Sequence, residues 1–447
     1  MCTNRRPYGL FEGCRILWVL CLWAAGLCGS QTRAAEPPSA VLRCGIAKAD
    51  ITPTKPVQMA GYSSRKELSQ GVHDPLSARV VAFECGGKRA VLVSLDNLGF
   101  YNDTAAQIRS VLLERCKLEP SELMLCAIHT HSAPTLTLNA GKDHPNNVEY
   151  TKTLTTTIGD QIERAMKSME PVSVGARRGY SPVGMNRREK VTEPGTDGTS
   201  KETIRLGRNA YGPTDKEVQV MKIARPDGTA IAAIFDYACH STSLGPGNMT
   251  ISGDVLGLAE QFVEKNLGGR LTVPAFAGAS GDIDPWFRVV PGFKTEAGWV
   301  PEPVLLSTML GEEVVNVYRD IKDLSASGPI RTAIATLDLP AQAAPQDPSE
   351  YTGPAKVTIT AARIGDTAFI GFGCEMLHAV GLEIKQASPF KHTFLFTHCN
   401  GAAGYLAPAE LYAQGGYEIQ TSPFSAEAAA RVVERAGAML RELNKNE

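Results

Sequence analysis

The chain lacks several features that identify common classes of protein. It contains no Cys-x-x-Cys motif, which excludes a structural zinc ribbon. It has no long block of lysine and arginine, and its net charge is only −2 over 447 residues, so neither a nucleic-acid-binding surface nor a polybasic membrane-binding segment is indicated. No repeat of fixed period is visible. The remaining composition, 43% hydrophobic and 21% charged, is that of an ordinary globular protein.

The first 35 residues differ from the rest of the chain. Arg5, Arg6 and Arg15 precede an apolar run over residues 16–27, which is too short to span a membrane comfortably. Small residues around Ala34 then provide a cleavage site, so residues 1–35 are predicted to be a Sec-type signal peptide. A retained membrane anchor is the alternative. We therefore expect an exported protein, periplasmic or secreted, with one mature domain over residues 40–443.

Cysteine usage fits export without requiring disulfides. Four of the eleven cysteines lie in the predicted leader, which leaves seven in the mature chain. An odd number means that at least one thiol stays unpaired. Three of them, Cys126, Cys239 and Cys374, stand beside polar residues of interest. Because cysteine is a small hydrophobe that fits a buried strand, these three are interpreted as core residues.

Strand and helix patterns are mixed along the mature chain. Hairpins are predicted at two places, 79–84 with 89–96 and 218–224 with 230–237. Helices are predicted over residues 105–116, 148–169, 255–265, 303–322 and 425–443. A long polar loop is predicted over 186–211. The predicted fold is α/β, one large domain with mixed β-sheets flanked by helices and an active site at the carboxyl-terminal ends of strands.

Two histidines follow a short apolar run that is predicted to be a buried strand, residues 122–125. Because residues i and i+2 of a strand share a face, His129 and His131 are expected to project together from the end of a sheet. This spacing at a strand end is typical of a metal site, since imidazole is the commonest neutral zinc ligand. The alternative is a pair of hydrogen-bonded histidines that cap a loop.

Polar side chains also follow other apolar strands. His240 ends the strand over 230–237, Glu375 follows the strand over 367–372, and Tyr405 lies in a Gly-rich loop. Two or three imidazoles and a carboxylate make a catalytic zinc site with an open position. Zinc lowers the pKa of bound water toward ~7 and so supplies hydroxide at neutral pH. A nearby tyrosine can ligate the metal or donate a hydrogen bond to a developing oxyanion.

Between about residues 44 and 440 the sequence resembles the neutral ceramidase family, zinc-dependent amidases that split ceramide into sphingosine and a fatty acid. The stretches that carry this resemblance are Gly45–Pro53, Gly61-Tyr62, Gly71–Arg79, Val91–Asp96, His129–Pro134, Asn186-Arg187, His240–Ser243, Ser252–Asp254 with Gly257, Gly281–Pro285, Glu375 and Asn400–Glu418. Together they form a specific pattern, although most of them are weak singly.

The resemblance implies one zinc ion and assigns its ligands. These are His129, His240, Glu375 and Tyr405. It also implies that His131 lies beside the metal, where it transfers a proton or contacts the substrate.

Three further assignments concern residues around this set. The resemblance implies that Arg187 binds the substrate. His378, three residues after Glu375, is an alternative ligand or a supporting histidine. The remaining histidines, His73, His144, His392 and His398, are assigned to structural or surface positions.

The sequence departs from the family pattern at two points. Where the family reads Gly-Asp-x-Ser-Pro, this chain has Gly281–Pro285, so Asp284 replaces the serine regarded as catalytic. An aspartate can act as the general base for metal-bound water; the alternative is a carboxylate that hydrogen-bonds the turn before Pro285. The resemblance also implies a C-terminal immunoglobulin-like domain in the ceramidases, which we do not expect after residue 443 here, and this leaves the substrate open.

These observations predict a zinc-dependent amidohydrolase. Zinc-bound hydroxide attacks the amide carbonyl of an N-acyl, sphingolipid-like substrate, Asp284 or His131 moves the proton, and Tyr405 and zinc stabilise the oxyanion. One alternative is a zinc hydrolase of the same fold that acts on a different ester, amide or sugar-linked compound; another is a non-catalytic binding protein. The expected partner is a small-molecule or lipid substrate, compatible with peripheral membrane contact, and no nucleic acid.

Overall fold

The computed structural model describes residues 41–101, 103–194, 199–286, 302–342 and 355–445. Contacts divide the chain into two units, Met1–Pro38 and Ser39–Glu447, and every helix and strand named below belongs to the second. The predicted signal peptide, residues 1–35, lies outside the described residues. None of the described helices is both long and apolar enough to cross a membrane.

The first sheet has five strands in the order β5 (Leu123–Ala127), β4 (Lys88–Leu95), β3 (Ser77–Cys85), β1 (Arg43–Asp50) and β6 (Glu170–Pro171). The predicted hairpin is confirmed, because β3 and β4 pair antiparallel from Ala78↔Leu95 to Cys85↔Lys88. Its turn residues, Gly86 and Gly87, have φ values of 59° and 78°. A two-residue type I′ turn needs positive φ at both positions, which glycine adopts without strain.

Two further sheets complete the framework. The second has the order β13 (Ala275–Ala277), β11 (Ala230–Tyr237), β10 (Glu217–Ala224) and β7 (Ser173–Tyr180). The third has the order β15 (Ile330–Asp338), β16 (Lys356–Ile364), β17 (Thr367–Phe372) and β19 (His392–Phe396). The second predicted hairpin, β10 with β11, is also confirmed.

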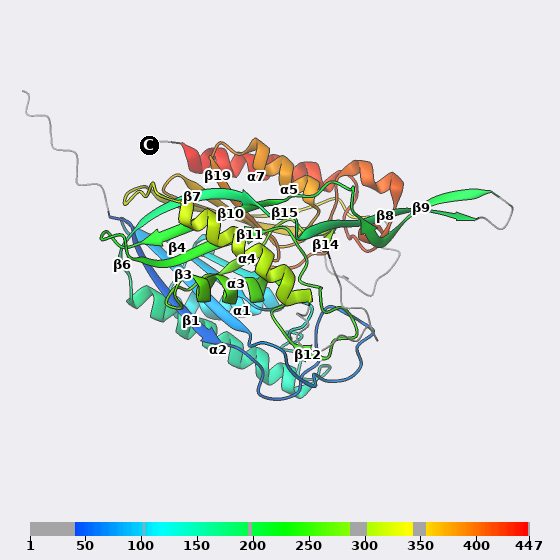
Figure 1. Cartoon of the computed structure of the whole chain (residues 1–447), viewed down its shortest axis with the longest axis horizontal. Coiled ribbons are helices and arrows are strands. Elements are labelled where there is room, and N and C mark those ends of the chain that lie inside the picture. The colour runs from blue at the N-terminus through cyan, green and yellow to red at the C-terminus, as the bar shows by residue number, and fades with distance from the viewer. Residues whose placement is uncertain (1–40, 102, 195–198, 287–301, 343–354, 446–447) are drawn as a thin grey trace, which may run out of the picture. The chain divides into compact units, whose positions relative to one another are not determined.

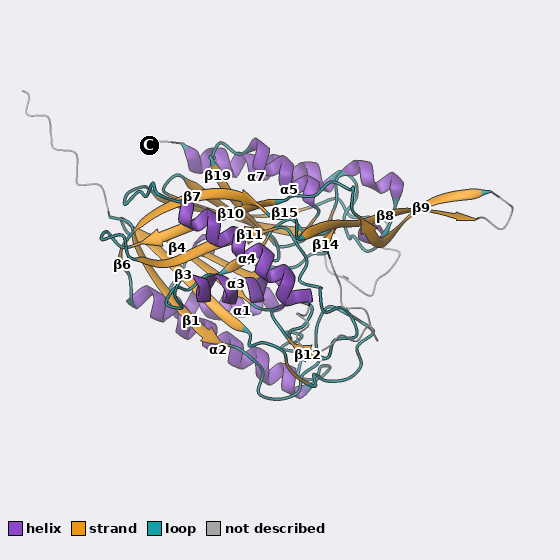
Figure 2. Cartoon of the chain, in the orientation of Figure 1, coloured by secondary structure: helices purple, strands orange, loops and turns teal. Residues whose placement is uncertain are grey.

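Helices cover the outer face of each sheet, as Figures 1 and 2 show. The helices α1 (Thr104–Cys116) and α2 (Pro145–Lys167) pack on the first sheet. The helices α3 (Asp254–Asn266) and α4 (Glu302–Asp320) pack on the second, and α5 (His378–Ala387) and α7 (Ala428–Asn444) on the third. The predicted α/β fold of mixed sheets flanked by helices is therefore confirmed.

The inner faces of the three sheets meet in one shared apolar layer. It contains Phe83 from the first sheet, Phe276 from the second and Phe369 from the third. Aromatic rings stack across this layer, with Phe276 and Phe396 at a centroid separation of 4.0 Å. Because all three sheets share this core, the ends of their strands are held in fixed positions relative to one another.

Each of these three sheets contains one parallel strand pair, and polar residues follow the carboxyl ends of these strands. The pairs are β4 with β5, β11 with β13, and β17 with β19. His129 follows β5, His240 follows β11, the Ser280–Asp284 turn follows β13, and Glu375 follows β17. The carboxyl ends of parallel strands lie at the same edge of a sheet, so His240 and the Ser280–Asp284 turn lie at one edge of the second sheet. An isolated bridge between Thr130 and Ser241 joins this edge to the segment that follows β5.

Short elements complete the fold. They are β2 (Gly71–Val72) with β12 (Thr250–Ile251), β18 (Glu375–Met376) with β20 (Tyr405–Leu406), the 3₁₀ helices η1 (Pro120–Glu122) and η2 (Ala409–Gln414), and α6 (Tyr417–Gln420).

The prediction of a long polar loop over residues 186–211 is wrong. This segment is a β-hairpin of β8 (Gly184–Pro194) and β9 (Ser200–Asn209), and β14 (Ile283–Pro285) pairs with its base. In Figure 1 the hairpin extends well beyond the three sheets. Its outer half is mostly exposed on both faces, so it has no alternation of apolar and polar residues that would have identified it as strand.

Candidate metal centre

The two histidines after β5 approach each other, but not for the reason given by their spacing. The strand ends at Ala127, and His129 has a φ of 61°, in the left-handed region. The prediction that His129 and His131 share one face of a strand is therefore wrong. The backbone turn brings their rings together instead, with the two Nε2 atoms 3.4 Å apart. Left-handed backbone is costly for a histidine, so tertiary contacts must hold it.

One carboxylate reaches both this pair and the histidine from the second sheet. Oε2 of Glu375 lies 3.5 Å from Nε2 of His129 and 3.7 Å from Nε2 of His240. The side chains of all three residues are almost completely buried. Residues separated by up to 246 positions in the sequence thus meet at one point. The structure brings together the residues that the sequence nominated as metal ligands.

Backbone carbonyls orient each imidazole in the same way. The Nδ1 atoms lie 2.8 Å from the Leu98 oxygen for His129, 3.1 Å from the Gly61 oxygen for His131, and 2.8 Å from the Ser280 oxygen for His240. A carbonyl oxygen only accepts hydrogen bonds, so each Nδ1 carries the proton and each Nε2 keeps a lone pair. Three nitrogen lone pairs therefore face the same small space.

This arrangement is suited to a divalent cation. The ligand atoms of His129, His131 and His240 lie within 4.8 Å of one another. Oε2 of Glu375 is buried and has no hydrogen-bond partner within the described part of the chain. A buried carboxylate oxygen without a donor is costly. A cation between the imidazoles and this oxygen would satisfy it, and this nitrogen and oxygen donor set is one that zinc accepts.

The electrostatics favour the protonation states that bind metal. Burial, and then the Arg187 guanidinium, lower the pKa of His240 to about 4. Burial, and then its histidine neighbours, lower the pKa of His131 well below 6.5. Burial alone would raise the pKa of Glu375, but the adjacent imidazoles, with His129 first, hold this pKa well below its usual value. At neutral pH the site therefore offers neutral imidazoles at His131 and His240 and an ionised carboxylate at Glu375.

Tyr405 lies directly beside Glu375. The two-residue strands β18 and β20 pair in parallel, with Glu375 opposite Tyr405. The Tyr405 side chain is buried, and the Arg187 guanidinium both hydrogen-bonds to it and lies 5.5 Å from its ring centroid. Tyr405 is therefore part of the same cluster as the nominated ligands.

Arg187 links Asp284 to the centre. Its Nη1 atom lies 3.3 Å from Oδ1 of Asp284 and 3.4 Å from Nε2 of His240. Strands β8 and β14, which carry the two residues, are neighbours in one small sheet. Both side chains are buried. Asp284 and the nominated ligand His240 therefore contact the same Arg187 guanidinium.

Three site residues were missed in the sequence. His398 stacks on His129 at a centroid separation of 3.8 Å and forms a second group of candidate ligands with His129 and Glu375. Tyr101 donates a hydrogen bond of 3.0 Å to Oε1 of Glu375. Glu418 accepts hydrogen bonds from Arg187 (2.8 Å) and Arg188 (2.7 Å). His398 follows the buried strand β19 much as His240 follows β11, and that signal could have identified it.

The other histidines have partners of a different kind. Nδ1 of His378 lies 2.7 Å from Oδ2 of Asp282, and its backbone N–H donates to Oδ1 of the same residue. His378 is not in either candidate ligand group among the described residues. The rest are His73, which pairs with Asp74, His144, which caps α2, and His392, which faces Gln219.

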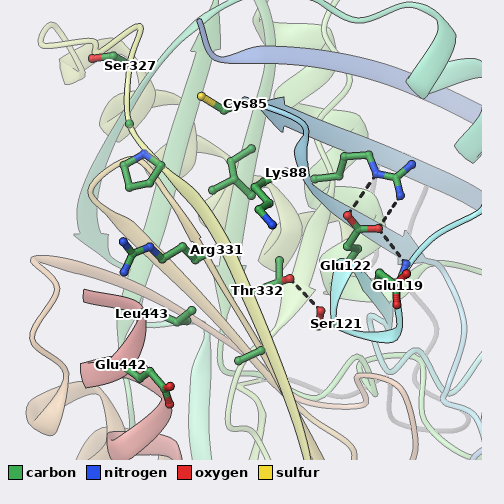
Figure 3. A pocket seen from close by; sticks show the side chains of 15 residues that line it. Cys85, Lys88, Glu119, Ser121, Glu122, Ser327, Arg331, Thr332, Glu442 and Leu443 are labelled. Carbon is green, nitrogen blue, oxygen red and sulfur yellow. Dashed lines mark hydrogen bonds and ion pairs between the residues drawn. The ribbon is translucent and has the colours of Figure 1, made fainter. Parts of the chain in front are cut away.

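A surface cavity of about 990 Å³ lies apart from this chemistry (Figure 3). It is lined by the β3–β4 turn, η1, β15 and the end of α7. Two of its charged side chains form an ion pair, with Nη2 of Arg89 2.8 Å from Oε2 of Glu122. None of its lining residues belongs to the histidine cluster, so the volume of this cavity does not make it a candidate for the metal centre.

We expect His398→Ala to weaken zinc binding by about tenfold or more, because the stacked ring holds His129 in its left-handed conformation and supporting residues of metal sites have effects of this size. His398→Phe keeps a flat ring without nitrogen and is expected to retain most of the affinity. Competition with a chromogenic chelator measures both. Wild-type affinity in His398→Ala, or equal weakening in His398→Phe, would contradict the stacking role.

Comparison with known proteins shows what this chain is similar to. Residues 42–288 match the model of a family described as neutral/alkaline non-lysosomal ceramidase, N-terminal. Neutral ceramidase 1 of Arabidopsis thaliana is 28% identical over 234 residues, covering 49% of this chain and 28% of the relative. Neutral ceramidase of Oryza sativa subsp. japonica is 26% identical over 278 residues, covering 59% of this chain and 33% of the relative. The chain thus spans about a third of the length of these curated relatives.

Two solved structures share the fold. The crystal structure of neutral ceramidase from Pseudomonas aeruginosa superposes with a TM-score of 0.70 at 19% identity, covering 91% of this chain and 76% of that one. A structure described as ceramidase complexed with C2 gives a TM-score of 0.71 at 18% identity with the same coverage. The matched family region contains His129, His240 and Asp284 and ends before Glu375 and Tyr405.

Proposed function

The chain belongs to the neutral/alkaline non-lysosomal ceramidase family, and from this we propose that it is a zinc-dependent amidohydrolase that cleaves the amide bond of an N-acyl, sphingolipid-like substrate. One observation carries the proposal: three Nε2 lone pairs and the unpartnered Oε2 of Glu375 converge in a buried space. Family membership supports a hydrolase of the ceramidase type. Zinc dependence and the sphingolipid-like substrate go beyond family membership and are proposed here from the site.

The proposed ligands are His129, His240, Glu375 and Tyr405. The first three carry the geometric support given above, and Tyr405 is included because it pairs directly with Glu375. A bound zinc ion would supply Lewis acidity and bring the pKa of a water molecule toward neutrality. His131, whose Nε2 lies 3.4 Å from that of His129, remains beside the ligands as a proton acceptor.

The chain's own residues then divide the work of amide hydrolysis. Asp284 accepts a proton from the attacking water and returns it to the leaving nitrogen, and its ion pair with Arg187 keeps the carboxylate in place. Glu418 fixes the other side of the same guanidinium at 2.8 Å. Tyr405 keeps its hydroxyl proton beside the ion and donates a hydrogen bond to the acyl oxygen as negative charge develops there. The products are a carboxylic acid and an amine.

We also propose that the protein is exported to the periplasm or secreted after removal of residues 1–35, leaving a catalytic domain over residues 40–443. The basis is the Arg-containing, apolar leader of the sequence. Peripheral contact with a membrane is proposed because the proposed substrate is lipid-like.

The test is a hydrolysis assay with purified protein. Long- and short-chain N-acylsphingosines are compared with ester analogues of the same chain lengths, before and after treatment with a chelator. We expect hydrolysis of the amides, its loss on chelation, and recovery when zinc is added back. Turnover that survives complete metal removal would contradict the metal part of the proposal. Preference for the esters would favour a different substrate, and binding without turnover would favour the non-catalytic alternative.

A further inference from the structure

Two buried cysteines face each other immediately behind the candidate metal centre. Cys126 lies in β5, and Cys399 follows β19, a strand of a different sheet. The two residues form an isolated antiparallel bridge between these segments. Cys399 is completely buried and Cys126 is 1% exposed. In the structure all seven cysteines of the described chain are free thiols.

The backbone pattern around this pair places the two side chains close together. The Ala127 N–H donates to the His398 oxygen at 3.3 Å, and the Asn400 N–H donates to the Leu125 oxygen at 2.8 Å. These hydrogen bonds flank Cys126 and Cys399 without joining them directly, which defines a non-hydrogen-bonded antiparallel pair. At such pairs the Cα atoms are ~4.5 Å apart and the side chains are closer than at hydrogen-bonded pairs. Disulfides join Cα atoms ~4.4–6.8 Å apart, so the register permits a bond.

The surroundings leave room for both sulfur atoms. A Cβ atom on Gly371 of β17 would clash with the Cys399 Sγ, so glycine at this position makes space for the thiol. Burial, and then a hydrogen bond with the Cys399 thiol, raise the pKa of Cys126 well above its ordinary value. The two thiols are therefore in contact with each other within a closed apolar layer.

We propose that Cys126 and Cys399 form a disulfide bond when the chain folds in an oxidising compartment. The co-reactant is a disulfide, RSSR, carried by glutathione or by a protein oxidant. One cysteine thiolate attacks RSSR, which forms a mixed disulfide and releases one RSH; the second thiolate then displaces the other RSH. Two electrons pass to the oxidant and each cysteine proton ends on a released thiol. Because both sulfurs are buried in the folded chain, the bond forms before final packing.

The bond joins the two segments that carry stacked rings of the site. Cys126 lies three residues before His129, and Cys399 follows His398 directly. Oxidation would therefore tie together the backbones on which the His129–His398 stack rests, at a separation of 3.8 Å between ring centroids. It would also close roughly 270 residues of chain, a long loop whose closure removes much of the entropy of the unfolded state. The inference is independent of the proposed reaction.

The test uses the full chain folded with a mixture of reduced and oxidised glutathione. Non-reducing proteolysis and mass spectrometry should recover one peptide pair that links Cys126 to Cys399, and thiol titration after unfolding should find two fewer thiols than in reduced protein. We expect the oxidised form to melt roughly 5 °C higher than the reduced form. No linked peptide in oxidatively folded protein overturns the proposal, and so does a linkage of either cysteine to another partner.

Single serine variants of the two cysteines test whether the linked peptide and the melting difference both come from this disulfide. Cys399→Ser and Cys126→Ser should each abolish the linked peptide and the difference in melting temperature between oxidised and reduced protein. Cys116→Ser, at the end of α1, is the matched control, because it removes another buried thiol and should leave both readouts unchanged. If a cysteine variant of the pair fails to fold, the peptide map of the unaltered chain still decides the question.

Discussion

Glu375→Gln is expected to lower kcat/KM by on the order of 10³-fold and to leave the purified protein largely without zinc. Glu375 supplies the single carboxylate in the convergent donor set of the described residues. Glutamine keeps the shape and the hydrogen bond from Tyr101 but removes the negative charge that offsets the cation. Metal ions contribute several kcal/mol of transition-state stabilisation, and ~1.4 kcal/mol corresponds to tenfold in rate.

The measurements are metal content by mass spectrometry and steady-state kinetics on the best amide substrate. Glu383→Gln on α5 is the matched control, since that carboxylate is exposed and lies on the helix that follows Glu375. The control should retain both metal and activity. Full zinc occupancy with normal turnover in Glu375→Gln would rule out this carboxylate as a ligand.

Asp284→Asn is expected to lower kcat by ~10²–10⁴-fold while zinc content stays at the wild-type level, the range typical for loss of a general base. Asparagine has the same shape and can still accept a hydrogen bond from Arg187, so the ion pair weakens but the turn before Pro285 is preserved. It cannot take a proton from water. The variant therefore separates proton transfer from a structural role.

Asp284→Ser provides the second comparison. It introduces the serine that the sequence resemblance predicts for this position, in an otherwise unchanged site. If Asp284 is the base for this chain, the serine variant should be as impaired as the asparagine variant, with zinc still bound. Wild-type turnover in Asp284→Asn would contradict the general-base role and favour a carboxylate that only stabilises the turn.

The fold was predictable where strands are buried on both faces. The apolar runs of β4, β11 and β17 are continuous and bounded by glycine or polar residues, which made them recognisable as strands. The β8–β9 hairpin was not predictable in the same way, because most of its outer residues face solvent on both sides. Its pairing depends on backbone register, which leaves little trace in composition.

The site was predictable only in part for a related reason. His240 and Glu375 follow buried strands, a pattern that the sequence displays directly. Glu375 and Tyr405 lie side by side because two strands of two residues each pair with one another. Strands this short show no periodicity in the sequence. Tyr101 and Glu418 reach the centre through contacts made only in the folded chain, 274 residues from Glu375 and 231 residues from Arg187 respectively. Such contacts are products of packing among the three sheets.

The central claim is that His129, His240 and Glu375 hold one divalent ion. Diffraction data collected on both sides of the zinc absorption edge, from crystals of zinc-loaded protein, test it most directly. We predict a single strong anomalous peak between the Nε2 atoms of the two histidines and Oε2 of the glutamate. Zinc located elsewhere in the molecule, with that space filled by water or by a side chain, would contradict it.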